Sequence, residues 1–310
     1  MESKSEKVKI LVILGPTASG KTGLALRLAE TVDAEILNAD SMQVYSRMDI
    51  GAAKPTPAQR GRVRHHLLDV VEPDEPFSAA DYRAAADSAI ADINARGKRV
   101  IVCGGTGLYI RALTRGLVNA PAGDEGIRME LRELADREGN SFLHGLLEKA
   151  DPGSAARLHP NDRMRVIRAL EICRITGRPV SELRAGHGFA EAPYECLKIG
   201  LAADRSALYE AIENRVDAMI RDGLVEEVRA LLEEGFPPAL KPLRSLGYRH
   251  MAAYLAGEYS LEEAVALMKR DTRRYSKRQL TWFNQDPEIK WIEYPENVAI
   301  IVRNAHDFFD

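Results

Sequence analysis

A segment near the N-terminus has the residue types and the spacing of a phosphate-binding loop. Residues 15–22 fit the pattern G-x-x-x-x-G-K-[ST], between an apolar run and a helix-like stretch. In such a loop, backbone N–H groups and a helix N-terminus face phosphate oxygens, a lysine reaches the outer phosphate, and a hydroxyl can hold Mg²⁺. The sequence therefore predicts a phosphate or diphosphate site with Mg²⁺ on the last residue of the loop. The loop residues are Gly15, Pro16, Thr17, Ala18, Ser19, Gly20, Lys21 and Thr22.

A carboxylate that serves this loop is expected at the end of a neighbouring strand. P-loop hydrolases hold Mg²⁺ with such an acid, but the apolar run at 99–102 is followed by Cys103 and two glycines. Asp40 follows the run at 34–37, and the carboxyl ends of parallel strands border the ligand crevice of an open α/β sheet. We expect Asp40 to point into the crevice of Lys21, where it fits a general base, a metal ligand or a helix cap.

The segment 65–69, His-His-Leu-Leu-Asp, offers a second acid and a histidine pair. Asp69 fits a substitute Mg²⁺ ligand, a surface residue or a capping residue. Adjacent residues of a strand face opposite ways, so His65 and His66 are not expected to share a metal ion. The cysteines are odd in number and lack zinc spacing, which predicts buried thiols; they are Cys103, Cys173 and Cys196.

Basic residues cluster near the C-terminus. Six cations and only Asp271 as an acid lie between Lys269 and Arg278, on an expected helix whose apolar stripe is Met268, Tyr275 and Trp282. Such a face fits a phosphate backbone, while a solvated surface and pairing within the protein are the alternatives. Two smaller sets are Arg163, Arg165 and Arg168, and Arg244 and Arg249.

The elements that position these residues follow from hydrophobic periodicity. Apolar runs alternate with helical stretches, which is typical of a parallel α/β sheet. Strands are expected at 8–14, 34–37, 99–102, 196–201 and 289–292. Helices are expected at 24–31, 78–96, 128–138, 141–149, 163–176, 206–221, 223–234 and 261–284. We expect residues 1–116 and 196–310 to form a P-loop NTPase-like α/β core with C-terminal basic helices, and 117–195 to form a mostly helical insertion domain.

Composition excludes several classes of protein. The 310 residues carry a net charge of −3, are 45% hydrophobic, and contain no apolar run near the start longer than Ile10 to Leu14. A membrane span needs about 20 apolar residues, and a secretory signal needs an apolar core that residues 1–9 lack. We therefore expect a cytoplasmic globular protein, with a monomer as the default state. A near-neutral charge leaves nucleic-acid binding open, because clustering of cations decides it.

Several motifs together resemble the tRNA dimethylallyltransferases, also called isopentenyl-tRNA transferases. The matches run in order over residues 10–285, and no single motif carries the resemblance. They are GPTASGKT at 15–22, ADSMQVY at 39–45, MDIGAAKP at 48–55, HHLLD at 65–69, GGTGLY at 104–109, HPNDRMRVIRALE at 159–171, NRVDAMIRDGL at 214–224, SLGYRH at 245–250 and KRQLTWF at 277–283.

The resemblance implies transfer of a dimethylallyl group from dimethylallyl diphosphate to N6 of the adenosine at tRNA position 37. The P-loop would then hold the diphosphate of the donor, with Mg²⁺, although ATP fits the same loop as a competitor. By similarity to the family, Asp40 would be the base, and Thr106 and Arg215 would lie at the reaction centre. The missing zinc-finger extension is similar to the bacterial type.

The family's tRNA contacts fall on the following positions of this sequence, besides Asp40 and Thr106. They are Ser41, Met42, Gln43, Arg128, Met164, Arg165, Val166, Ile167, Arg168, Arg244, Ser245, Leu246, Gly247, Tyr248, Arg249, Lys277, Arg278, Gln279 and Trp282. Two positions depart from the family: Asn284 replaces an arginine, and Met164 replaces a glutamine found in some members. An enzyme that prenylates or phosphorylates free adenine nucleotides is the alternative function, and a non-catalytic P-loop RNA-binding protein is a third.

Overall fold

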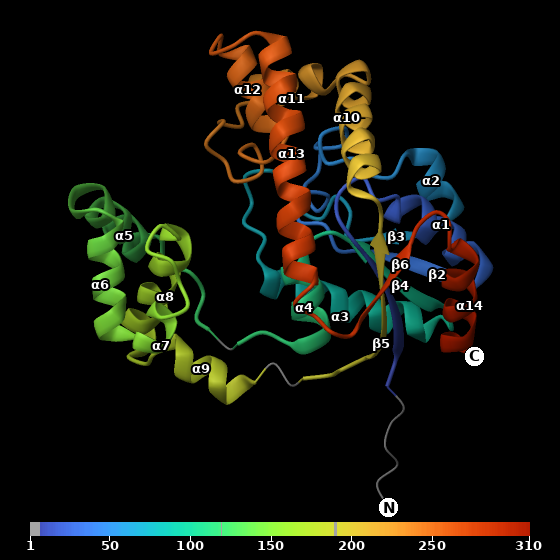
Figure 1. The fold of residues 1–310 in the computed structure, drawn as a ribbon, viewed down its shortest axis with the longest axis horizontal. Helices are drawn as coiled ribbons and strands as arrows, with labels where there is room; N and C mark the ends of the chain where they lie inside the picture. The colour runs from blue at the N-terminus through green and yellow to red at the C-terminus, as the bar shows by residue number, and fades with distance from the viewer. Residues whose placement is uncertain (1–6, 119, 189–190) are drawn as a thin grey trace, which may run out of the picture. The chain divides into compact units, whose positions relative to one another are not determined.

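The architecture is built on one parallel sheet. A computed structural model describes residues 7–118, 120–188 and 191–310, so the charged segment at 1–6 lies outside the described residues. Six strands pair in the order β3-β2-β4-β1-β5-β6, and every pairing is parallel (Figure 1). The strands are β1 (Lys9–Leu14), β2 (Ala34–Asn38), β3 (His65–His66), β4 (Arg99–Gly104), β5 (Glu195–Ala202) and β6 (Ile289–Glu293).

The chain divides into two compact units, Met1–Thr114 with Pro193–Asp310, and Arg115–Ala192. We call the first the sheet unit and the second the helical unit. The helices of the sheet unit are α1 (Lys21–Thr31), α2 (Pro57–Arg62), α3 (Ala79–Ala95), α4 (Gly107–Arg115, which ends at the boundary), α10 (Arg205–Arg221), α11 (Leu224–Glu233), α12 (Tyr248–Leu255), α13 (Leu261–Phe283) and α14 (Val298–Phe309). Those of the helical unit are α5 (Glu125–Glu138), α6 (Asn140–Ala150), α7 (Pro152–Ala155), α8 (Arg163–Thr176) and α9 (Val180–His187).

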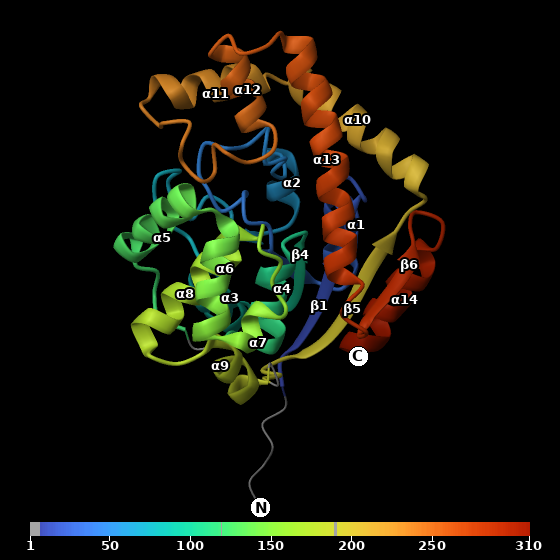
Figure 2. The same cartoon turned by 60° about the vertical axis from the view of Figure 1, so that its left-hand side comes forward.

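The two faces of the sheet bury separate hydrophobic cores. Alternate residues of β1 go to opposite faces: Ile10 and Val12 join the core that includes α3, α4 and α13, and Leu11 and Ile13 join the core that includes α1 and α14. Burial on both faces explains why β1 is a continuous apolar run. Within the sheet unit, α10 to α13 gather beyond the carboxyl end of β5 (Figures 1 and 2). These helices therefore extend the edge of the sheet where ligands bind.

The predicted parallel α/β class is confirmed, and the long elements lie within a few residues of their expected bounds. Helix α3 begins directly after Ser78, where its expected range starts, and Ser78 and Asp81 form a capping box there. Six helices were not predicted: α2, α4, α7, α9, α12 and α14. All except α14 have nine residues or fewer, which is too short for a 3.6-residue period to be recognised reliably. The 12-residue α14 has an apolar face that we did not recognise.

The sheet unit also takes in residues that we assigned to the insertion at 117–195. β5 begins at Glu195, whose N–H donates to Val8, and the Tyr194 hydroxyl donates to Asp87 at 2.6 Å. These contacts attach residues 193–195 to the sheet. Within the described part of the chain, no helix is long and apolar enough to cross a membrane.

Candidate active site

The P-loop joins the end of β1 to the start of α1. Its turn uses positive φ angles at Gly15, Ala18 and Gly20, and Gly20 also needs to lack a side chain because a Cβ there would lie 2.7 Å from the Tyr294 ring. Helix α1 begins at Lys21, so its first N–H groups point toward the loop. The hydroxyl of Ser19 is buried and finds no partner among the described residues. The loop thus presents unsatisfied donors, as an anion site requires.

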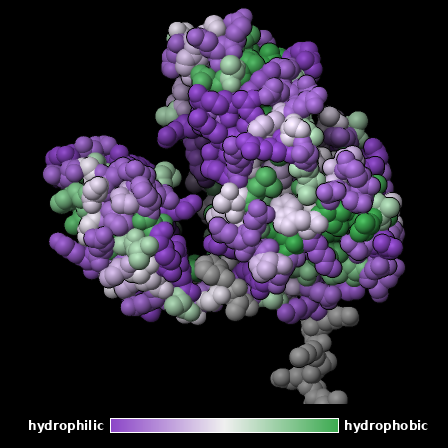
Figure 3. Space-filling view, in the orientation of Figure 1, coloured by the Kyte–Doolittle hydropathy of each residue, from purple (hydrophilic) through white to green (hydrophobic). Residues whose placement is uncertain are grey.

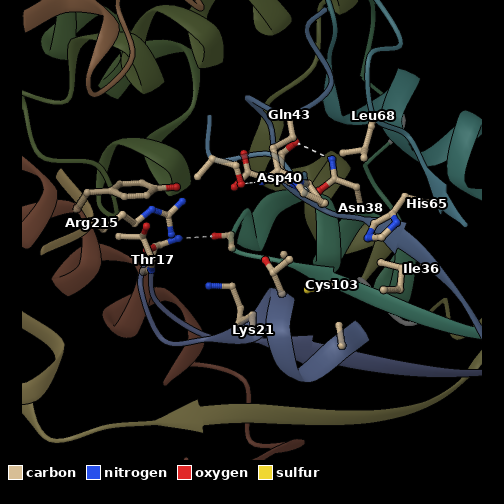
Figure 4. Close-up of a pocket in the computed structure, with 18 residues that line it drawn as sticks. Thr17, Lys21, Ile36, Asn38, Asp40, Gln43, His65, Leu68, Cys103 and Arg215 are labelled. Atoms are coloured by element: carbon tan, nitrogen blue, oxygen red, sulfur yellow. Dashed lines mark hydrogen bonds between the residues drawn. The ribbon is translucent and has the colours of Figure 1, made fainter. Parts of the chain in front are cut away.

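Two cations line the cavity beside this loop without a carboxylate partner. Both Lys21 and Arg215 border this cavity (Figure 4). The Lys21 ammonium donates to the Pro16 carbonyl at 2.6 Å, and in the described chain neither cation has an acidic oxygen within 4.0 Å. Burial lowers the pKa of Lys21 to about 8, and burial likewise lowers the pKa of Arg215. Positive charge held this way favours an anionic ligand.

Asp40 lies in the same cavity, as its place after β2 predicted (Figure 4). Its Oδ1 accepts from the N–H of Met42 at 2.8 Å, and its own N–H donates to Asn38 Oδ1 at 3.1 Å. Among the described residues nothing donates to the second carboxylate oxygen. One oxygen therefore fixes the turn, and the other is available to a proton or a metal ion.

The end of β4 brings the next turn against Asp40. Gly104 has no room for a Cβ, because the backbone of Ala39 lies in its place. The N–H of Thr106 donates to the Ala39 carbonyl at 3.1 Å, and its hydroxyl accepts from the N–H of Ser41 at 2.9 Å. Thr106 thus orients the turn that carries Asp40, and it does not border the cavity. Cys103 replaces the acid of P-loop hydrolases, and burial raises its pKa to about 11, so it is a neutral thiol.

Helix α13 reaches the P-loop from the far end of the chain. Gln279 accepts from the N–H of Thr17 at 2.8 Å and donates to the Gly105 carbonyl at 2.9 Å. We expected Gln279 to contact tRNA, but its side chain is 7% exposed and its amide joins two backbone turns. Its structural role is to hold the P-loop against the turn after β4.

A second cavity adjoins the first and shares four of its residues. The shared residues are Thr17, Asp40, Arg215 and Tyr275. The second cavity continues along Ser41 and Met42 to Arg244, Ser245, Leu246, Arg249 and Arg278, all of which were predicted as RNA contacts. Tyr275 was assigned to an apolar stripe, and its position on both cavities could not be read from the periodicity of the helix.

The basic face of α13 is largely paired with acids of the sheet unit. Lys269 bonds Asp217, Arg273 bonds Glu213, and Asp271 lies within 3.5 Å of Arg249, Arg270 and Arg274. The face is nevertheless hydrophilic (Figure 3). Lys277, Arg278 and Arg244 have no carboxylate within 4.0 Å in the part of the chain that the structure describes. Pairing within the protein therefore accounts for part of this cluster, and these three cations remain for a ligand.

In the helical unit, the predicted contacts fall into an exposed and a buried group. Met164 is 81% exposed, and Arg165 is exposed beside Asp162 at 3.2 Å. Arg128 and Arg168 both bind the buried Glu171, at 3.0 and 2.5 Å. Val166 and Ile167 are buried in the core of this unit, and Tyr248 is buried in the sheet unit, so the side chains of these three predicted contacts are not exposed to a ligand. The reason is helical geometry, which turns neighbours of exposed residues inward.

Lys54 is a site-shaping residue that sequence reasoning missed. Its side chain is buried, and its ammonium bonds Asp69, Asp49 at 2.8 Å and the Tyr45 carbonyl at 2.7 Å. Asp69 also binds Arg60 at 2.6 Å, so it is a member of an ion-pair network, and it borders neither of the two cavities described above. The ion pair of Lys54 with Asp69 joins two separate motifs, and neither motif by itself indicates that its charged residue has a partner in the other.

The residues of the cavity can hold a divalent cation only together with a ligand. Thr22 and Asp40 supply two oxygen donors at its wall, and the described residues contain no group of three or more His, Cys, Asp or Glu that could bind a metal ion. Mg²⁺ is commonly bound by one or two protein oxygens together with substrate phosphates and waters. The donor set therefore fits a cation that arrives with a diphosphate.

Comparison with known proteins identifies relatives along the whole chain. Residues 43–286 match the family described as IPP transferase. The tRNA dimethylallyltransferase 2 of Geotalea uraniireducens is 59% identical over 309 residues, covering all of both chains. The tRNA dimethylallyltransferase of Geobacter metallireducens is 55% identical over 99% of both chains.

Solved structures agree with this assignment. The full-length tRNA isopentenylpyrophosphate transferase of Bacillus halodurans has a TM-score of 0.72 and 38% identity over 97% of both chains. A eukaryotic dimethylallyltransferase acting on tRNA has a TM-score of 0.83 and 27% identity, over 97% of this chain and 79% of that one. The family match over residues 43–286 and the coverage of the whole sequence by its relatives lead to one conclusion: this chain belongs to the IPP transferase family.

Proposed function

We propose that this protein transfers a dimethylallyl group from dimethylallyl diphosphate to N6 of the adenosine at position 37 of tRNA. One observation carries the proposal: Lys21 and Arg215 border the same cavity as Asp40, and neither cation has a carboxylate oxygen within 4.0 Å among the described residues. Two such cations and a P-loop suit a diphosphate, and a lone carboxylate beside them suits proton removal from an acceptor. The names of the relatives supply the acceptor and the group transferred.

The chemistry divides between the two ends of the cavity. The adenine N6 lone pair attacks C1 of the donor, the C1–O bond breaks, and its electron pair leaves with the diphosphate. The developing charge on that oxygen is met by Lys21, Arg215 and the N–H groups of the P-loop. Asp40 accepts the proton that N6 loses, since it lines the cavity and one of its carboxylate oxygens accepts no hydrogen bond from the described residues. Thr106 contributes by fixing the turn on which Asp40 lies.

We assign Mg²⁺ to Thr22, with the diphosphate supplying further oxygens. When bound, the cation would neutralise part of the diphosphate charge. The remaining neutralisation comes from the protein's own cations. Because tRNA is used in the cytoplasm, we place the reaction there, with a monomer as the working unit.

The acceptor would enter through the second cavity. An adenosine must leave the anticodon-loop stack to bring N6 to Asp40, and Ser41, Met42 and Arg278 line that route. Arg244 and Lys277 would meet phosphates nearby, and Arg249 would do so if RNA displaces it from Asp271. The helical unit would add RNA contacts through Met164, Arg165, Arg128 and Arg168, with residues 115–192 acting as the tRNA-contacting insertion.

The deciding experiment incubates the protein with unmodified tRNA carrying adenosine 37, dimethylallyl diphosphate and Mg²⁺, and analyses nucleosides by mass. A gain of one C5H8 unit on that adenosine is the expected result. Free AMP in place of tRNA is the matched control. Prenylation of AMP but not of tRNA would move the function to free nucleotides and leave the basic face of α13 without a role.

A further inference from the structure

One carboxylate outside both cavities binds three consecutive backbone groups of a loop that borders them. Glu227 of α11 accepts through Oε2 from the N–H groups of Asp49 at 2.9 Å and Ile50 at 2.7 Å. Its Oε1 accepts from the N–H of Gly51 at 3.1 Å and from the hydroxyl of Tyr248 at 2.6 Å. Four donors therefore converge on the two oxygens of one side chain.

The loop at 49–53 is also clamped by packing. Gly51 lies against the Tyr248 ring so closely that a Cβ would overlap the ring atoms. Burial and the nearby Glu227 charge raise the pKa of Tyr248, so its hydroxyl stays a donor. Inside the loop, the N–H of Ala53 donates to the Ile50 carbonyl at 2.9 Å. The backbone from 49 to 53 is thus held from outside by Glu227 and from within by its own turn.

This loop sets the orientation of a side chain in the cavity. The amide nitrogen of Gln43 donates to the carbonyls of both Ala52 and Ala53, at 3.1 Å each. Two carbonyl oxygens at that distance require the nitrogen on this side, because an amide oxygen there would be repelled. Gln43 therefore keeps its amide oxygen for another partner, and none of the described residues donates to it. Gln43 and Ala53 border the first cavity, and Ala52 borders the second.

We propose that Glu227 is a positioning residue for the acceptor base: by holding loop 49–53, it makes Gln43 present a hydrogen-bond acceptor to the cavity. The inference rests on the proposed function, because the base is the ligand that Gln43 would face. A fixed acceptor favours an exocyclic amine at C6 of a purine and opposes the carbonyl of guanine at the same place. Glu227 would thus act on base selection without touching substrate.

The primary test compares Glu227→Gln with Glu226→Gln, an exposed glutamate one position away on α11. The amide of Glu227→Gln cannot accept on both sides, so we expect hydrogen exchange at residues 49–51 to quicken at least tenfold. We expect kcat/KM for tRNA to fall about tenfold to hundredfold, and the Kd for inorganic diphosphate to stay within twofold. Glu226→Gln should match the wild type in all three.

A double-mutant cycle separates positioning from a loss of overall structure. If Glu227 acts through Gln43, the Glu227→Gln effect should shrink to less than threefold in a Gln43→Ala background. The preference for binding an anticodon hairpin with adenosine 37 over one with guanosine 37 should also narrow in Glu227→Gln. Tyr248→Phe removes one of the four hydrogen bonds to Glu227 and keeps the ring. We expect the same changes in exchange rate, kcat/KM and base preference, each smaller than in Glu227→Gln. This variant replaces Glu227→Gln in the test if that protein does not fold.

The outcomes separate this inference from the proposed function. In one outcome the wild-type protein prenylates tRNA, and Glu227→Gln lowers kcat/KM by the same factor with and without Gln43→Ala. That outcome would overturn the positioning role and leave the proposed function intact. Unchanged exchange at 49–51 would do the same. A wild type that does not prenylate tRNA would overturn the proposed function, while faster exchange in Glu227→Gln would still show the clamp.

Discussion

The cations of the cavity and the cations of α13 differ in what neutralises them. Lys21 and Arg215 share a cavity and lack a carboxylate within 4.0 Å among the described residues, whereas Lys269, Arg273 and Arg274 each bond an acid. An unpaired, desolvated cation is costly, so its presence signals an anion that completes the site. A paired surface cation costs little and carries no such signal. The absence of a carboxylate partner, more than the number of positive residues, therefore indicates where an anionic ligand binds.

The largest expected effect tests whether Asp40 is a catalytic base or a distant counter-charge for the cavity cations. Asp40→Asn should lower kcat by about 10²–10⁴-fold, the usual contribution of a general base. Removing a negative charge near the anion site should leave diphosphate binding unchanged or tighter. Single-turnover transfer and diphosphate titration measure the two effects. Weaker diphosphate binding with near wild-type turnover would make Asp40 a binding residue.

Removing a cavity cation should cost nearly as much. Lys21→Ala is expected to lower kcat by about 10²–10³-fold, the size seen when one donor to a developing anion is lost. Lys269→Ala is the matched control, since that lysine is paired with Asp217 at 2.7 Å. Its kcat should stay within about twofold. Equal losses in the two variants would abolish the distinction between unpaired and paired cations.

The lowered pKa of Lys21 makes anion binding in the cavity depend on pH. Burial lowers this pKa from 10.5 to about 8, so the ammonium of the free enzyme is charged below pH 8 and loses its proton above it. Affinity for inorganic diphosphate should therefore decrease above pH 8, and the decrease should approach about tenfold for each further pH unit. Lys21→Arg stays charged throughout. The ratio of the two dissociation constants, measured by calorimetry from pH 7 to 9.5, cancels the titration of the ligand; a flat ratio would contradict the assignment.

The smallest effect distinguishes the cations of the basic region from one another. Lys277→Ala and Arg278→Ala should each flatten the dependence of log Kd for tRNA on log salt by about 0.7–0.9, one phosphate contact each. Arg273→Ala and Arg274→Ala should change the slope less, because Glu213 and Asp271 already bind these arginines. Filter binding at several salt concentrations measures the slopes. Equal slopes for all four would mean that the ion pairs open when RNA binds.

Local patterns in the sequence were enough to predict the frame of the site. The apolar run of β1, the glycine and lysine spacing after it, and the position of Asp40 behind β2 are short-range signals. Each follows from backbone conformation and from the rule that ligands bind at strand carboxyl ends. The parallel sheet, the P-loop and the meeting of Lys21 with Asp40 in one cavity could therefore be predicted.

Only the tertiary structure shows which residues hold the loops of the site in place without lining it or while bonding its backbone. Gln279 bonds Thr17 across 262 positions of the chain, and Glu227 holds Asp49 across 178. Neither contact can be recognised from the periodicity of the sequence, because periodicity reveals only neighbours within one helix or strand, and these side chains bond loops far away in the chain. Burial likewise separated Tyr248 from the exposed arginine beside it. The sequence determined the elements and their chemistry, and long-range packing decided which groups have partners, since pairing depends on distances that no local pattern encodes.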